Sequence, residues 1–358
     1  MSKSESIDLI KRLSQANGVS GFEDEVVTVV RSYAADFGTV TEDQMRNVYL
    51  KGKAQDKTKP TILLDAHMDE VGFIVQAIKP NGTLRFLPLG GWVPSNIPAH
   101  RVKVQNSEGR YLTGIIASKP PHFMSEKERN QPLLIEDMVI DLGVTSAQEV
   151  VEVLKIEIGA PVVPEVTFTY SAELDVLSGK AFDCRIGCAC LLETLKEVVD
   201  LDGHSNVVAT LTSQEEVGER GATVAARNVQ PDIAIVFEGC PADDTFEETY
   251  MIQSALKKGP MLRHFDVSMI TNPRFQKFAL ELGKELNIPV QASVRKGGGT
   301  NGAVINLVKR GVPCIVIGIP VRYAHTHYGY SAYEDFVHAR ELAVALIKRL
   351  DKETIASF

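Results

Sequence analysis

The sequence predicts an α/β fold in which a mixed central sheet is flanked by helices and interrupted by an inserted, mostly β domain. Helical patterns and apolar strands alternate on both sides of a middle segment, which is typical of a sheet covered by helices. The middle segment loses the helical pattern and shows alternating strands joined by tight turns. We therefore expect a discontinuous α/β domain, residues 1–71 and 167–358, with residues 72–166 inserted as a β-rich domain.

The first part of the chain predicts two helices and two strands, at residues 6–18, 20–38, 47–52 and 60–67. Each helical pattern ends in glycine, and the second begins with Ser20-x-x-Glu23, which favours a capping box. The last of the four segments is nearly all apolar, so we expect its strand to lie at the centre of the sheet.

The inserted segment predicts two β-hairpins, at residues 72–89 and 101–118. The first turns at Asn81-Gly82, a dipeptide that tight hairpins prefer, and the second turns at Glu108-Gly109. A short helix and a further strand are expected after them, at residues 146–155 and 164–170.

The rest of the chain returns to alternating strands and helices. Strands are expected at residues 206–213, 233–239, 289–294 and 314–320, and helices after residues 182–185 and at 273–286 and 331–350. The last helix is long and amphipathic, as expected for a helix that packs against a sheet.

The composition is that of a globular protein, since 44% of the residues are hydrophobic and 23% are charged. The formal net charge of −8 argues against a nucleic-acid or anionic-membrane partner. No apolar stretch is long enough to span a bilayer, and the first residues lack the apolar run of a secretory signal. Five cysteines without a C-x-x-C pair favour a reducing compartment, so we expect a cytoplasmic protein.

Acidic and imidazole side chains gather where predicted strands end or a helix begins: His67, Asp69, Asp183, Glu215, Glu216, Glu238 and His325. In an open α/β sheet, ligands bind at the carboxyl ends of the strands. We therefore expect these side chains to converge, although they lie far apart in the sequence.

Two imidazoles with several carboxylates form the ligand set expected for zinc, cobalt or manganese. The carboxylates outnumber the needs of one ion, which favours two ions about 3.5–4 Å apart. A bridging ligand must offer one oxygen to each ion, and a short side chain at a tight turn, such as Asp183, suits that position. Asp69 lies two residues after His67, on the same strand face, and can hold and orient its imidazole.

Glu215 and Glu216 are adjacent at the end of a predicted strand, where neighbouring side chains point to opposite faces. One glutamate can bind a metal while the other accepts the proton of metal-activated water. Taken alone, the pair is more typical of a solvated strand end or helix N-terminus; its coincidence with the other ligand-type residues favours catalysis. The pattern leaves open which glutamate is the base.

Seven motifs occur along the chain in this order: AHMDEVGF, SKPPH, KAFDCRIGC, SQEEVGERGA, FEGCPADD, KGGGTNGA and RYAHTH. Together they resemble the M42 family of metallo-aminopeptidases, the group of glutamyl and tetrahedral aminopeptidases. The resemblance covers essentially the whole chain. It implies a phosphorylase/hydrolase-like domain of the zinc-peptidase type and a PDZ-like insert used in assembly. It also implies a cytoplasmic homo-oligomer, from a dimer to a dodecamer, that acts on short peptides with a free N-terminus.

The resemblance also implies two divalent metal ions per subunit, zinc or cobalt, with manganese as an alternative. One ion would be held by His67, Asp183 and Glu238, and the other by Asp183, Glu216 and His325. Asp183 would then bridge the two ions.

Two catalytic roles are implied as well. Glu215 would be the general base, and Asp69 would orient His67. We also expect the glycine-rich loop with Gly299 to shape the substrate pocket.

The chain departs from the family pattern at a few positions. Cys184 stands where relatives often have Asn or Asp, and Glu238 stands where several have Asp. Thr300-Asn301 replaces the commoner Thr-Asp, which removes one negative charge near the presumed substrate side. We expect Thr300 and Asn301 to affect specificity more than the chemistry.

Two other functions stay open on these observations. A glycoside hydrolase needs two carboxylates about 5–9.5 Å apart beside an aromatic sugar-binding cleft, and the chain has one Trp. A catalytically inactive metal-binding scaffold is the other alternative, against which the complete ligand set argues.

The preferred N-terminal residue and the native metal are not readable from the sequence. An acidic preference would require a cation in the pocket, for which the candidates are Arg220, Arg263, Arg295 and Lys296. Trp92 is interpreted as a packing or oligomer contact. His327 is interpreted as a support for the site or a solvent-exposed group.

Overall fold

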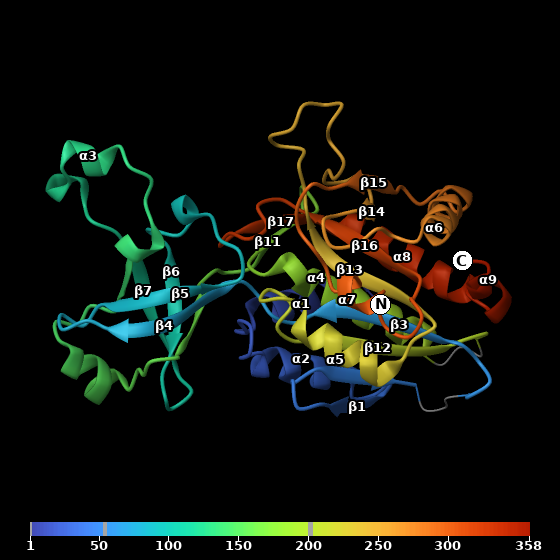
Figure 1. Cartoon of the computed structure of the whole chain (residues 1–358), viewed down its shortest axis with the longest axis horizontal. Helices are drawn as coiled ribbons and strands as arrows, with labels where there is room; N and C mark the ends of the chain where they lie inside the picture. The colour runs from blue at the N-terminus through green and yellow to red at the C-terminus, as the bar shows by residue number, and fades with distance from the viewer. Residues whose placement is uncertain (1, 53–55, 200–202) are drawn as a thin grey trace.

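The computed structural model describes residues 2–52, 56–199 and 203–358. In this part of the chain an α/β domain lies beside a closed β-barrel (Figure 1). The barrel occupies the left of that view, and the large sheet with its helices occupies the right.

Eight strands form the central sheet, in the order β1-β2-β12-β3-β13-β16-β14-β15. Their bounds are β1 (Thr39–Glu42), β2 (Val48–Lys51), β12 (Asn206–Thr212), β3 (Thr61–His67), β13 (Ile233–Pro241), β16 (Cys314–Val321), β14 (Met261–Phe265) and β15 (Gln291–Val294). The central strands β12, β3, β13 and β16 are parallel to one another, whereas β2 pairs antiparallel with β12 and β14 pairs antiparallel with β16. The mixed sheet confirms the predicted α/β class.

Helices bury both faces of this sheet. Successive side chains of β3 point to opposite faces and join two different apolar cores. Ile62 and Leu64 join the larger apolar core, whereas Leu63 joins a smaller core on the opposite face. Helices that contact the strands on the larger side are α4 (Phe182–Val198), α6 (Pro273–Glu285) and α8 (Tyr333–Arg349), and those on the smaller side are α5 (Arg220–Val229) and α7 (Gly302–Ile305).

The remaining elements of the α/β domain pack around this core. They are the helices α1 (Lys3–Gln15), α2 (Asp24–Ala34) and α9 (Lys352–Ala356) and a three-stranded sheet of β10 (Thr169–Ser171), β11 (Val176–Gly179) and β17 (Gly329–Ala332). α1 contacts α4, α2 and β11, which joins the start of the chain to its middle.

The barrel closes in the strand order β4-β5-β8-β7-β6-β9. Its strands are β4 (Gly72–Ile78), β5 (Leu84–Leu89), β6 (Arg101–Gln105), β7 (Tyr111–Ala117), β8 (Val139–Asp141) and β9 (Pro161–Pro164). Gly82 and Gly109 at the two hairpin turns have φ of 84° and 78°, which glycine adopts without strain. A short helix α3 (Glu126–Arg129) projects from the barrel between β7 and β8 (Figure 1).

Several local expectations differ from the structure. The strand expected at 164–170 is two strands, β9 and β10, because the chain leaves the barrel between them. The short helix near 146–155 is a π-helical segment, Glu149–Leu154. The capping box expected at Ser20 is wrong, since α2 begins at Asp24 without a side-chain cap. Strand β14 was not expected.

In the part of the chain that the structure describes, no helix is both long and apolar enough to cross a bilayer.

Candidate metal centre

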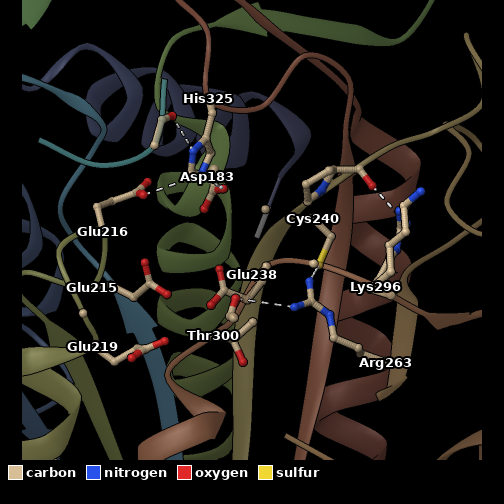
Figure 2. A pocket seen from close by; sticks show the side chains of 18 residues that line it. Asp183, Glu215, Glu216, Glu219, Glu238, Cys240, Arg263, Lys296, Thr300 and His325 are labelled. Carbon is tan, nitrogen blue, oxygen red and sulfur yellow. Dashed lines mark hydrogen bonds and ion pairs between the residues drawn. The ribbon is translucent and has the colours of Figure 1, made fainter. Parts of the chain in front are cut away.

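The candidate ligands meet beyond the carboxyl ends of the central strands. His67 ends β3, Glu238 lies near the end of β13, and His325 follows the end of β16. Asp183 lies in the first turn of α4. The acidic side chains and His325 line a cavity of about 500 Å³, and Figure 2 shows them facing its interior. The parallel strands thus bring distant residues to one site.

His67 is buried and is not among the residues that line this cavity, but it contacts several of them. Its Nε2 is 3.1 Å from Asp183 Oδ1, 3.6 Å from Glu238 Oε2 and 3.8 Å from Glu215 Oε2. Its Nδ1 lies 3.1 Å from the backbone oxygen of Asp69 and 3.3 Å from Oδ1 of the same residue. Nδ1 therefore donates to Asp69, which leaves Nε2 as the nitrogen that faces the carboxylates.

Asp183 lies between the two imidazoles. Its Oδ1 is 3.1 Å from His67 Nε2, and its Oδ2 is 3.4 Å from His325 Nε2. Each oxygen of one carboxylate therefore faces a different imidazole. Burial alone would raise the pKa of Asp183, but its contacts with His325 and His67 outweigh burial and lower the pKa.

His325 completes the other side of the cluster. Its Nε2 lies 3.5 Å from Glu216 Oε2, and its Nδ1 lies 2.9 Å from the backbone oxygen of Gly91. Nδ1 thus donates to Gly91, and Nε2 is left to face Glu216 and Asp183.

Asp69 is fully buried and holds the glutamate pair as well as His67. Its Oδ1 accepts a hydrogen bond from the Glu215 backbone N–H at 2.9 Å, and its Oδ2 accepts one from the Glu216 N–H at 3.1 Å. The Ser20 hydroxyl also donates to Oδ2, at 2.6 Å. The expected contact of Asp69 with His67 is present, and the backbone contacts were not expected.

The carboxylates of the cluster are crowded in a way that a cation would relieve. Burial, with Glu238 and other acids nearby, raises the pKa of Glu215 well above its ordinary value. Burial and neighbouring Asp183 raise the pKa of Glu216 to about 8. A divalent ion bound among these groups would favour their charged forms and lower both pKa values.

The donor set fits a metal centre. Donor atoms of His67, Asp183 and Glu216 lie within 4.8 Å of one another, as do those of His67, Cys184 and Glu238. One buried oxygen of Glu216 and one of Glu238 have no hydrogen-bond partner among the described residues. Buried carboxylate oxygens without partners are costly, and metal coordination would satisfy them.

Cys184 is the residue after Asp183, at the position where Asn or Asp was the more usual expectation. Its thiol donates to the backbone oxygen of Phe237 at 3.1 Å, so the position keeps a hydrogen bond. Burial raises the pKa of this thiol well above its ordinary value, which favours the neutral form.

The far wall of the cavity is cationic. Arg263, Arg295 and Lys296 line it, together with Gly299 and Thr300 of the glycine-rich loop. Figure 2 shows Arg263 and Lys296 on the side opposite the acidic cluster. Arg220, the other candidate cation, is exposed and is not among the residues that line the cavity.

Asn301 lies behind this wall and is fully buried. Its side-chain amide donates to Asp65 Oδ2 at 2.7 Å and to Thr212 Oγ1 at 2.8 Å. Of the three loop residues expected to shape the pocket, Gly299 and Thr300 line the cavity and Asn301 supports it from behind.

The sequence did not indicate that Ser20 and Gly91 contribute to the site. The sequence around Ser20 indicated only a capping box, which is not formed. The hydrogen bond of Ser20 to Asp69 could not be predicted, because the two residues are distant in sequence. Gly91 lies in a Gly90-Gly91 pair, and paired glycines are a sign of close backbone approach. A Cβ at Gly91 would lie 3.3 Å from His325 Nδ1, a tight contact that would press on the imidazole.

Comparisons with known proteins agree on one family. The family model described as M42 glutamyl aminopeptidase matches residues 47–342. Glutamyl aminopeptidase of Lactococcus lactis is 31% identical over 354 residues, which is 98% of either chain. The TET aminopeptidase from the marine sediment archaeon Thaumarchaeota archaeon SCGC AB-539-E09 has a TM-score of 0.94 at 38% identity, over 99% of both chains. The Pyrococcus horikoshii TET1 peptidase, which can assemble into a tetrahedron or a large octahedral shell, has a TM-score of 0.85 at 26% identity, over 96% of this chain and 100% of its own.

Proposed function

Because this chain belongs to the M42 glutamyl aminopeptidase family and is a metal-dependent aminopeptidase, we propose that it removes the N-terminal residue of short peptides at a two-metal site. The observation that carries the two-metal proposal is the position of Asp183, whose two oxygens face His67 and His325 separately. One carboxylate so placed suits a bridge between two cations.

We assign the ligands from the same contacts. His67, Asp183 and Glu238 would hold one ion, and Asp183, Glu216 and His325 would hold the other. Zinc and cobalt suit this mixture of imidazole and carboxylate, and manganese is the alternative. Two bound ions would polarise the scissile carbonyl and lower the pKa of the attacking water.

Glu215 and Glu216 are proposed to have different roles. Glu216 faces His325, which supports its role as a ligand, whereas Glu215 faces the region beside His67. We propose that Glu215 accepts the proton of the attacking water and then donates it to the departing amine. Asp69 holds both backbone N–H groups, so it fixes the direction of each side chain.

Replacing Glu215 with Gln tests this assignment. The variant should bind metal as the wild type does, because the amide still fits, and should lose about 10²–10⁴-fold in turnover of aminoacyl-anilides, because it cannot accept a proton. Metal content by mass spectrometry and anilide hydrolysis measure the two effects. The exposed Glu173→Gln is the matched control, outside the cavity, and should behave as the wild type. Full activity in Glu215→Gln would refute the role of the base.

Chelation separates this proposal from its alternatives. Removal of metal should abolish anilide hydrolysis, and zinc, cobalt or manganese should restore it. Release of reducing sugar from a glucan without hydrolysis of any anilide would support a glycosidase instead. Tight metal binding with neither activity would support an inactive scaffold.

We further propose that the protein is a cytoplasmic homo-oligomer. Each of its five cysteines is a free, buried thiol, as a reducing compartment permits. The assembly of the P. horikoshii relative supports oligomerisation, and the barrel is the proposed PDZ-like assembly element. Size-exclusion chromatography with light scattering would measure the mass of the assembly.

A further inference from the structure

The metal centre is supported by backbone of the barrel. Gly91 follows the barrel strand β5, and its carbonyl accepts the hydrogen bond from His325 Nδ1 at 2.9 Å. Without this acceptor, His325 could carry its proton on Nε2 and rotate, so that no lone pair would face Asp183 and Glu216. The barrel therefore contributes to the orientation of a residue in the α/β domain.

The loop that carries His325 needs such support. Tyr323 and His325 have φ of 63° and 60°, in the left-handed region that side chains other than glycine rarely adopt. A backbone in this region persists only when its surroundings hold it. The loop joins β16 to β17, and something must fix its path between them.

Four rings, here called the ring stack, connect the inserted segment to this loop: Phe73, Trp92 and His100 of the inserted segment, and His327 of the loop itself. Trp92 stacks on Phe73 at 4.8 Å between centroids and contacts His327 at 5.1 Å. His327 stacks on His100 at 3.9 Å with the ring planes 12° apart. The ring of His327 is thus held between Trp92 and His100.

The ring stack connects the barrel to the α/β domain. Phe73 lies on barrel strand β4, Trp92 follows Gly91, and His100 immediately precedes barrel strand β6. His327 lies in the loop of the α/β domain, two residues after His325. It is 1% exposed, so its ring is enclosed by these contacts. The inserted segment therefore contacts the His325 loop at two points: Gly91 accepts the hydrogen bond of His325, and Trp92 and His100 pack against His327.

We propose that Trp92 and His327 are positioning residues that hold His325 in the orientation its metal ion requires, so that metal affinity depends on the barrel. This inference rests on the proposed function, because it takes His325 as a ligand. Groups that orient a metal ligand typically affect metal affinity about 10–100-fold when removed.

The test uses the whole chain described here and four substitutions at the ring stack. Trp92→Ala and His327→Ala should each weaken the binding of one of the two ions about 10–100-fold, with the other ion little changed. Trp92→Phe and His327→Phe keep an aromatic ring and should restore most of the affinity. Titration with Co²⁺ against a competing chelator measures both constants, and the visible absorption of Co²⁺ reports the change of ligand geometry.

A barrel variant away from the loop serves as the control. Phe86 contacts Phe73 edge-on at 4.9 Å in the barrel core, but it is not part of the ring stack. Phe86→Leu should lower the melting temperature of the metal-free protein without changing either Co²⁺ constant. Equal loss of affinity in Phe86→Leu and Trp92→Ala would overturn the inference, because the effect would then be loss of barrel stability.

His325→Ala separates this inference from the proposed function. It should leave one Co²⁺ ion bound where the wild type binds two. If it binds two as tightly as the wild type, the proposed ligand set is wrong and the inference falls with it. If it loses one ion while Trp92→Ala and His327→Ala keep wild-type constants, the ligand set stands and the inference alone is overturned.

Discussion

Asp69 connects three parts of the site through one carboxylate. It lies beside His67, accepts the backbone N–H groups of Glu215 and Glu216, and accepts the hydroxyl of Ser20. Burial would raise the pKa of Asp69, but the contact with His67 and these hydrogen bonds outweigh it and lower the pKa. The Asp69 carboxylate is therefore charged. Its hydrogen bonds fix the backbone of Glu215 and Glu216, so that both side chains can face the same cavity.

Lys296 differs from the other two cations of the cavity wall. Arg263 forms an ion pair with Asp266 at 2.8 Å, and Arg295 forms one with Asp243 at 3.2 Å. Lys296 is exposed and has no ion pair among the described residues. Its charge alone is not offset by a neighbouring carboxylate, so it is the group best placed to attract an acidic side chain of a substrate.

Lys296→Gln should therefore lower the turnover of any substrate with an N-terminal glutamate. We expect kcat/KM for a glutamyl-anilide to fall about tenfold relative to a leucyl-anilide, the effect of one charged hydrogen bond at a partly exposed site. Steady-state kinetics with both substrates measure this ratio. Arg220→Gln removes a cation outside the cavity and should leave the ratio unchanged. An unchanged ratio in Lys296→Gln would rule out this role.

At the scale of elements, the sequence predicted the strands that carry the site. Their apolar runs and the polar residues that follow them are local patterns, so the positions of His67 and Glu238 could be read directly. Strand β14 was missed because its residues, MLRHF, mix apolar with basic side chains. Glu23 was taken for a capping residue, yet its carboxylate accepts the N–H of Gly21 and of distant Gln214. Tertiary partners of this kind leave no local pattern.

The packing of β13 against α4 sets the position of Asp183. Gly239 of β13 lies against the first turn of α4, and a Cβ there would meet the Phe182 carbonyl and lie 2.8 Å from Asp183 N. Gly239→Ala must therefore displace α4. We expect it to lower the free energy of unfolding by about 1–3 kcal/mol and to weaken metal binding, because Asp183 moves with the helix.

Urea unfolding of the metal-free protein and Co²⁺ titration measure the two effects of Gly239→Ala. Gly38→Ala is the matched control, since its Cβ would lie 3.4 Å from the Lys51 carbonyl, an ordinary contact. It should change metal affinity little. Wild-type Co²⁺ constants in Gly239→Ala would show that the helix does not set the position of Asp183.

At the scale of the whole molecule, the site depends on contacts between the two bodies that no local pattern predicts. The hydrogen bond of His325 with Gly91 joins residues 234 positions apart. The sequence indicated that Trp92 is a packing or oligomer contact, but it left open which residues it contacts; within the chain it packs against Phe73 and His327. Only the three-dimensional arrangement relates the barrel to the metal centre, because side-chain contacts across two domains depend on how their surfaces meet.

The surface of a single chain also leaves large apolar side chains exposed. Phe246 and Tyr250, 69% and 81% exposed, lie in the segment between β13 and β14, which projects from the α/β domain (Figure 1). Exposed apolar groups of this size commonly mark protein interfaces. In the homo-oligomer proposed above, we expect a second copy of this chain to cover them.

The double variant Phe246→Glu/Tyr250→Glu should therefore reduce the mass of the assembly, because two charges would be buried against the neighbouring copy. Light scattering after size exclusion measures the mass, and the melting temperature of the dissociated chain should change little, since neither residue is buried within it. Phe246→Tyr/Tyr250→Phe keeps both rings and should retain the wild-type mass. A wild-type mass in the glutamate variant would place the interface elsewhere on the molecule.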